Sequence, residues 1–311
     1  MAPRRTRSSV VLVALVLALA GCGSGDGPAA APPPRPAPGP VAAVPLLPEL
    51  RAAAPVRVAA AGDIADRLES AAATAAVVTA VAPDFVLTTG DNAYGSGSAE
   101  DFATKYEPTW GRFKAITRPS PGNHDYRTPE AAGYFDYFAE QTGRAPYYAW
   151  NAGAWRFYSL NSEIDMTVGS PQERWLRADL AENAGRNALA YWHRPRFTCS
   201  SRHAPEGGTQ PLWAALTEAG AEVLLTGHNH AYERFEKRGP GGEQAGTGVR
   251  EFVTGAGGAH RYRLREGCPG REAGEDDAFG VLELTLRPDG YAWAFRTVDG
   301  RIADAGSDRT G

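Results

Sequence analysis

The sequence of 311 residues has three cysteines, three lysines and little excess charge. Its formal net charge is −4, and its arginines are scattered along the chain rather than clustered. Binding to nucleic acid requires a concentrated positive surface. The sequence therefore predicts no nucleic-acid-binding surface.

The apolar run near the N-terminus is too short to form a membrane-spanning helix. Val10 to Ala20 is uninterrupted but has only 11 residues, whereas a helix needs about 20 to cross the hydrocarbon core. Three arginines precede this run, which is typical of a signal peptide. The following Leu19-Ala20-Gly21-Cys22 resembles a bacterial lipobox. We therefore predict a lipoprotein signal peptide over residues 1–21, with an export route left open.

Residues 22–54 are predicted to be a tether, because they are almost all Ala, Pro and Gly and cannot bury a core. Lipidation of Cys22 would attach the exported protein to the outer face of a bacterial membrane. Residues 55–311 remain as one catalytic domain. The other two cysteines, Cys199 and Cys268, either form a disulfide or are free thiols.

The first half of this domain alternates short apolar runs with segments of helical periodicity, which is typical of parallel βαβ units. Strands are expected at 56–61, 85–89, 187–192 and 222–226, with a further strand leading to Gly122, a hairpin within 147–161, and helices at 68–81, 99–113, 171–182 and 212–219. Towards the C-terminus, residues 251–254, 281–286 and 291–298 alternate apolar and polar positions, which predicts antiparallel sheet.

Five of these expected strands end in a motif that contains Asp, Asn or His. The motifs are Gly62-Asp63, Gly90-Asp91, Gly122-Asn123-His124-Asp125, His193 and Gly227-His228-Asn229-His230. In parallel α/β sheets, sites form in the loops beyond the carboxyl ends of the strands. Four of the six histidines lie in these motifs, so we expect them to meet in one site.

The donor types in these motifs favour two divalent or trivalent first-row metal ions. Tyr94 follows three residues after Asp91 and adds a phenol. Carboxylates, an amide oxygen, imidazoles and this phenol are too rich in nitrogen for Ca²⁺ and lack the thiolates of structural Zn²⁺ sites. One ion would not use seven candidate ligands. A two-metal centre can activate a bridging hydroxide for phosphoester hydrolysis.

Taken in order, the five motifs resemble those of the calcineurin-like metallophosphoesterases. Within that superfamily, Tyr94 and the stretch from Gly227 to Arg234 are closest to purple acid phosphatases. Most members have a histidine two residues after the first Asp, where this chain has Ala65. The resemblance implies an α/β fold, a four-layer α/β/β/α sandwich of mixed sheets.

The resemblance also implies the ligand set. Asp63, Asp91, Tyr94 and His230 would bind Fe³⁺, since a phenolate is a hard donor. Asp91 would bridge to a second ion, Fe²⁺, Zn²⁺ or Mn²⁺, which would also be bound by Asn123, His193 and His228. The alternative for Tyr94 is a packing role near a strand end.

Three further residues are candidates for catalysis. His124 would bind the phosphate or protonate the leaving oxygen, and Asp125 would orient His124 and raise its pKa. The alternative for Asp125 is a turn carboxylate that caps local backbone. His203 lies in the loop after His193 and is either a substrate contact or solvated surface.

Together these features predict a hydrolase that cleaves small phosphate monoesters through attack by a metal-bridging hydroxide. Two alternatives remain open: a phosphodiesterase or nucleotidase with the same centre, and a surface lipoprotein that binds phosphate or metal without turnover. The sequence does not indicate an oligomeric state.

Overall fold

The computed structural model describes residues 54–311. The signal peptide, the lipidation of Cys22 and nearly all of the tether concern residues outside the described range, and all three stay predictions. Within the described range, every helix is too short or too polar to cross a membrane.

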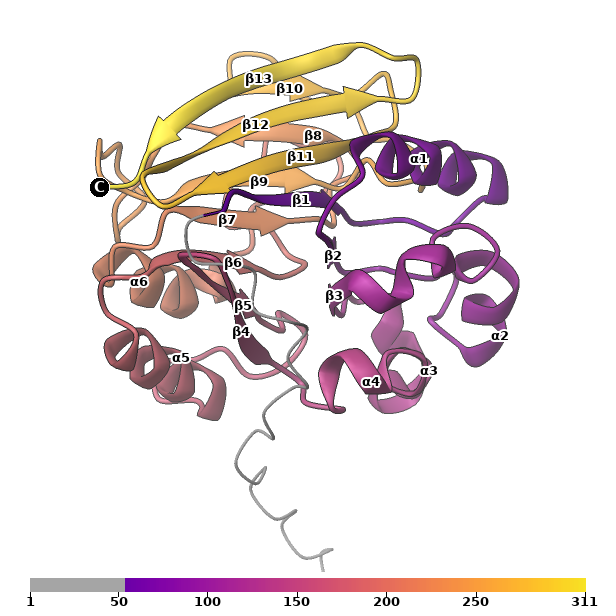
Figure 1. Ribbon diagram of the computed structural model, residues 1–311, viewed down its shortest axis with the longest axis horizontal. Helices are drawn as coiled ribbons and strands as arrows, with labels where there is room; N and C mark the ends of the chain where they lie inside the picture. The colour runs from indigo at the N-terminus through magenta and orange to yellow at the C-terminus, as the bar shows by residue number, and fades with distance from the viewer. Residues whose placement is uncertain (1–53) are drawn as a thin grey trace, which may run out of the picture. The chain divides into compact units, whose positions relative to one another are not determined.

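The first of two mixed sheets has the strand order β13-β12-β11-β1-β2-β3 (Figure 1). Strands β1, β2 and β3 are parallel, whereas β11 to β13 are antiparallel to their neighbours. The strands are β1 (Val56–Ala61), β2 (Phe85–Thr89), β3 (Thr117–Ser120), β11 (Gly280–Arg287), β12 (Gly290–Thr297) and β13 (Ile302–Arg309).

The second sheet has the order β10-β8-β9-β7-β6-β5-β4. Its centre, β5-β6-β7-β9, is parallel, and antiparallel strands complete both edges. The strands are β4 (Tyr148–Ala152), β5 (Trp155–Ser159), β6 (Asn187–Tyr191), β7 (Val223–Thr226), β8 (Tyr232–Phe235), β9 (Arg250–Thr254) and β10 (Arg271–Glu275).

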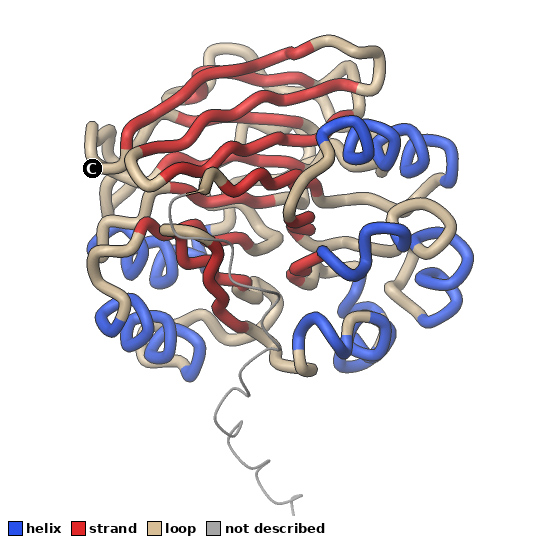
Figure 2. Tube along the Cα trace, in the orientation of Figure 1, coloured by secondary structure: helices blue, strands red, loops and turns tan. Residues whose placement is uncertain are grey.

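Helices cover the outer face of each sheet (Figure 2). The α-helices are α1 (Leu68–Val81), α2 (Ala99–Asp101), α3 (Ala132–Tyr137), α4 (Ala139–Thr142), α5 (Pro171–Glu182) and α6 (Gln210–Glu218). A π-helix continues α2 over Phe102–Tyr106, and 3-10 turns lie at Gly111–Ile116, Asp125–Arg127, Pro129–Ala131 and Gly207–Thr209.

Three apolar clusters correspond to the three interfaces between four layers. One is formed by inward-facing side chains of both sheets, such as Val58 and Leu225. A second packs α1 and the segment from Phe102 to Phe138 on the first sheet. The third packs α5 and α6 on the second sheet. The predicted four-layer α/β/β/α sandwich is confirmed.

Several predicted elements differ from the structure for identifiable reasons. The helix expected over 99–113 breaks after Tyr106, because Pro108 lacks the amide hydrogen needed to continue it. Strand β9 was expected in antiparallel sheet. It pairs antiparallel with β8 on one side but parallel with β7 on the other. Strands β10 and β13 were not predicted, because they are polar edge strands without alternating apolar residues.

The two cysteines of the folded region are joined. Cys199 and Cys268 form a disulfide with Cα atoms 5.8 Å apart. Next to it, the Ser201 amide donates to the Arg263 carbonyl at 2.8 Å. The loop after β6 is therefore fixed to the segment that precedes β10.

Candidate metal centre

The predicted ligands lie in the loops that follow the carboxyl ends of β1, β2, β3, β6 and β7. Asp63, Asp91 and His228 have φ values of 58°, 51° and 67°. Residues other than glycine seldom adopt this left-handed backbone conformation, which is concentrated at functional sites. It turns these side chains out of their strands and towards a common point.

Glycines allow the loops to approach one another closely. A Cβ atom on Gly122 would lie 2.3 Å from Asp91 Oδ1, and one on Gly90 would lie 2.6 Å from His193 Nδ1. Both distances are too short for any larger residue. These glycines therefore have a steric role in bringing the ligands together.

One half of the site surrounds the phenol of Tyr94. Its Oη donates to Asp63 Oδ1 at 2.9 Å and lies 3.1 Å from Asp91 Oδ2 and 3.2 Å from His230 Nε2. His230 Nε2 is also 3.2 Å from Asp63 Oδ1. All four residues are buried.

The other half surrounds His193. Its Nε2 lies 3.1 Å from Asn123 Oδ1, 3.2 Å from His228 Nδ1 and 3.4 Å from Asp91 Oδ2. Its Nδ1 contacts the Thr89 carbonyl at 2.9 Å, which fixes the ring. Asp91 is shared by both halves.

These donor atoms fit two metal ions. Ligands about 2.0–2.2 Å from one ion and at right angles to each other lie about 3 Å apart, which is close to the spacing in each half. The carboxylates of Asp63 and Asp91 are buried, and within residues 54–311 they pair with the rings of His230 and His193 and with no lysine or arginine. Buried anions require a positive partner, which metal ions bound by these same side chains would supply in place of protons on the two rings.

The pKa values of three site residues show what metal binding would require. Burial, then the charges of Asp63 and Asp91, raise the pKa of Tyr94 well above its usual value, so a phenolate there requires a nearby cation. Burial, then the charge of a protonated His193, lower the pKa of His228 to about 2. Against the effect of burial, the charge of Asp91 raises the pKa of His193 to about 10, so His193 would have to lose its proton to bind a metal ion.

His228 and His230 do not share a face, contrary to the expectation from their spacing. Strand β7 ends at Thr226, and the left-handed backbone at His228 turns the chain. As a result, His228 joins the His193 half and His230 joins the Tyr94 half.

His124 lies at the opening of the site, with a side chain that is 18% exposed. Its Nε2 is 3.9 Å from Asp91 Oδ2, and its Nδ1 contacts the Gly95 carbonyl at 2.9 Å. The ring is therefore held by main chain and presents Nε2 to the centre.

The predicted role of Asp125 is corrected by the structure. Its buried Oδ2 accepts hydrogen bonds from Gly122 N at 2.9 Å and from Asn92 Nδ2 at 3.0 Å, and His124 is bound by Gly95 instead. Burial, then Asp91, raise the pKa of Asp125 to about 7. Asp125 stabilises the loop that carries Asn123 and His124, as in the alternative interpretation.

His203 lies beside the centre. Its ring centroid is 4.3 Å from that of His228 and 5.4 Å from that of Tyr262. Tyr262 in turn stacks on His230 at 4.1 Å, and His230 Nδ1 contacts the His260 carbonyl at 2.5 Å. Tyr262 could not be found from the sequence, because it lies 32 residues after His230, the nearest motif residue, and in no predicted element.

Sequence comparisons agree with this geometry. The calcineurin-like phosphoesterase family model matches residues 56–232, which is more than half of the chain. Purple acid phosphatase 22 of Arabidopsis thaliana is 25% identical over 59% of this chain and 46% of its own length. Purple acid phosphatase 15 of the same plant is 28% identical over 50% of this chain and 36% of its own length. The chain thus spans less than half the length of these relatives.

Among solved structures, purple acid phosphatase PPD1 from yellow lupin seeds has a TM-score of 0.67 at 18% identity, covering 82% of this chain and 54% of that one. At this identity the likeness shows the fold. The family match, the five motifs in order and the convergence of their donors on one point establish that the chain belongs to the calcineurin-like phosphoesterase family.

Proposed function

We propose that the protein is a dinuclear-metal phosphatase that hydrolyses small phosphate monoesters, similar to purple acid phosphatases. One observation carries this proposal: seven donor atoms of the types needed for two ions converge around Asp91, with His124 at the same opening. Bound ions would neutralise the phosphoryl oxygens and lower the pKa of an attacking water.

The candidate residues would have separate roles in metal binding, proton transfer and substrate contact. Asp63, Asp91, Tyr94 and His230 would hold one ion, Fe³⁺. Asp91, Asn123, His193 and His228 would hold the other, Fe²⁺, Zn²⁺ or Mn²⁺. His124 would donate a hydrogen bond to the phosphate or a proton to the leaving oxygen. His203, next to His228, would contact the substrate.

The location follows as part of the same proposal. An exported enzyme, lipid-anchored through Cys22, would act on phosphate esters outside the cell. The disulfide between Cys199 and Cys268 supports this location, because disulfides persist in oxidising compartments.

Turnover of matched esters tests the proposed function. Residues 55–311, loaded with iron and zinc, should release nitrophenolate faster from a nitrophenyl phosphate monoester than from the corresponding diester. Preference for the diester would indicate a phosphodiesterase with the same centre. Absence of turnover with both ions bound would contradict a catalytic role and favour a binding protein.

Tyr94→Phe tests the identity of the first ion. The iron-loaded protein should show a visible charge-transfer band, because a phenolate bound to Fe³⁺ donates charge to it, and the variant should lose this band. Tyr262→Phe is the matched control, since Tyr262 stacks on His230 but is not a predicted ligand. An unchanged band in Tyr94→Phe would show that Tyr94 is not a ligand.

A further inference from the structure

Asp101 is the centre of a hydrogen-bond network in the loop that follows Tyr94. Its Oδ1 accepts a hydrogen bond from Gly95 N at 3.1 Å, and its Oδ2 accepts hydrogen bonds from Ser96 N at 3.1 Å and Ser98 N at 3.3 Å. The hydroxyl groups of the same two serines also donate to Oδ2, at 3.1 and 2.9 Å. One carboxylate therefore accepts five hydrogen bonds from a single short loop.

Lys105 connects Asp101 to the same loop. Its ammonium group pairs with Asp101 Oδ1 at 2.8 Å and donates to the carbonyl of Tyr94. Burial opposes the charge of Asp101, but the hydrogen bond from Lys105 and those from Ser96 and Ser98 hold the pKa of Asp101 well below its usual value. The carboxylate thus stays ionised, and both of its oxygens act as acceptors.

The peptide group between Gly95 and Ser96 links Asp101 to His124. Its N–H donates to Asp101, and its carbonyl, that of Gly95, contacts His124 Nδ1 at 2.9 Å. This peptide is trans, so its N–H and C=O groups point in opposite directions. Asp101 and His124 therefore hold the same peptide from opposite sides, and Asp101 fixes the direction in which the Gly95 carbonyl points.

The Gly95 carbonyl determines which nitrogen of His124 carries a hydrogen. A carbonyl oxygen only accepts hydrogen bonds, so His124 Nδ1 must donate. Arg127 Nη1 donates to the same oxygen at 3.0 Å. With Nδ1 engaged in this way, the proton that the ring gives up or takes up is the one on Nε2, which lies 3.9 Å from Asp91 Oδ2.

We propose that Asp101, held by Lys105, is a positioning residue for His124. Its carboxylate fixes the peptide between Gly95 and Ser96, and this peptide keeps the His124 ring in the orientation in which Nδ1 retains its hydrogen and Nε2 transfers a proton to the leaving oxygen. This inference rests on the proposed function of His124 as a proton donor. Neither Asp101 nor Lys105 is a candidate metal ligand.

The ring nitrogens of His124 test the proposal without turnover. Nitrogen NMR of the zinc-loaded protein, with the His124 signals assigned from their absence in His124→Ala, should show the neutral ring with its hydrogen on Nδ1. In Asp101→Asn, an amide N–H₂ donor replaces one acceptor oxygen, so the loop should shift and the ring should show both tautomers. Lys105→Met, which keeps the carboxylate, should give a smaller fraction of the second tautomer.

Hydrogen on Nδ1 to the same extent in Asp101→Asn and in the wild type would overturn the proposal. Hydrogen on Nε2 in the neutral ring of the wild type would overturn it as well. If Asp101→Asn does not fold, Lys105→Met decides by the same criterion.

Kinetics show whether this orientation matters for catalysis. Asp101→Asn should lower kcat for an alkyl phosphate about 10-fold, which is less than the loss expected on removing a general acid, and should affect nitrophenyl phosphate much less. In the His124→Ala background, the same substitution should lower kcat for the alkyl phosphate less than about 2-fold, because Asp101 acts through His124. Equal losses for both esters in both backgrounds would show a merely structural role.

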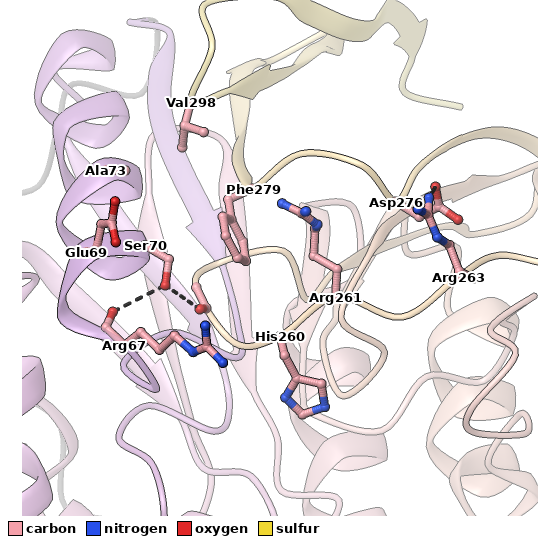
Figure 3. A pocket seen from close by; sticks show the side chains of 11 residues that line it. Arg67, Glu69, Ser70, Ala73, His260, Arg261, Arg263, Asp276, Phe279 and Val298 are labelled. Atoms are coloured by element: carbon pink, nitrogen blue, oxygen red, sulfur yellow. Dashed lines mark hydrogen bonds and ion pairs between the residues drawn. The ribbon is translucent and has the colours of Figure 1, made fainter.

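Glu69→Gln provides the matched control. Glu69, like Asp101, is a carboxylate in the first turn of a helix, and it lines a cavity of about 550 Å³ beside the start of α1 (Figure 3). Among residues 54–311, none of the candidate site residues lines this cavity, so the variant should leave the tautomer of His124 and both kcat values unchanged. If the wild type hydrolyses neither ester, the proposed function fails, and NMR alone decides about Asp101.

Discussion

Replacing Asp91 with asparagine is expected to lower kcat/KM for nitrophenyl phosphate by about 1000-fold or more and to reduce bound metal from two ions to one or none. Asp91 is the one predicted ligand common to both halves of the site, 3.1 Å from Tyr94 Oη and 3.4 Å from His193 Nε2. Asparagine keeps the size but removes the negative charge with which Asp91 would hold both ions. Loss of one ion would remove several kcal/mol of transition-state stabilisation.

Elemental analysis and kinetics on the same samples would check this expectation. Asp165→Asn is a matched control, because Asp165 is exposed and, among residues 54–311, its side chain bonds only to Thr167 in its own turn. A variant at Asp91 that retained two ions and activity within a few-fold of the wild type would show that Asp91 does not bridge.

Replacing His124 with alanine is expected to lower kcat about 100- to 1000-fold for an alkyl phosphate, the range of general acid catalysis. The loss should be much smaller for nitrophenyl phosphate, because nitrophenolate leaves without being protonated. His124 is suited to this role because its ring is held by the Gly95 carbonyl, and Nε2 lies 3.9 Å from Asp91 without being part of the ligand cluster.

The dependence on the leaving group separates a proton donor from a residue that only binds phosphate. His203→Ala provides the comparison, since His203 packs on His228 and should affect both esters alike. If His124→Ala reduced kcat equally for both esters, His124 would be a phosphate-binding residue and not the general acid.

The fold could be predicted largely because its central strands are buried on both faces. Such strands appear in the sequence as short apolar runs, and β1 and β2 begin and end as expected. The edge strand β13 is mostly exposed. It forms because β12 offers a free edge to pair with, and the residues of β13 do not alternate between apolar and polar. Local sequence could not reveal it.

The sequence was enough to predict that the candidate donors lie close together, but not the geometry in which they meet. Donors at the ends of parallel strands must lie at one edge of a sheet, which brought Asp63 and Asp91 together. The backbone turn at His228 and the bonds of Asp125 to Gly122 and Asn92 depend on tertiary contacts. Periodicity carries no information about either.

The most direct test of the metal centre is anomalous X-ray scattering from crystals of the protein loaded with iron and zinc. Two ions are predicted. One should lie among Asp63, Asp91, Tyr94 and His230, and the other among Asp91, Asn123, His193 and His228. A single ion, or ions bound elsewhere while these side chains remain unligated, would contradict the dinuclear centre.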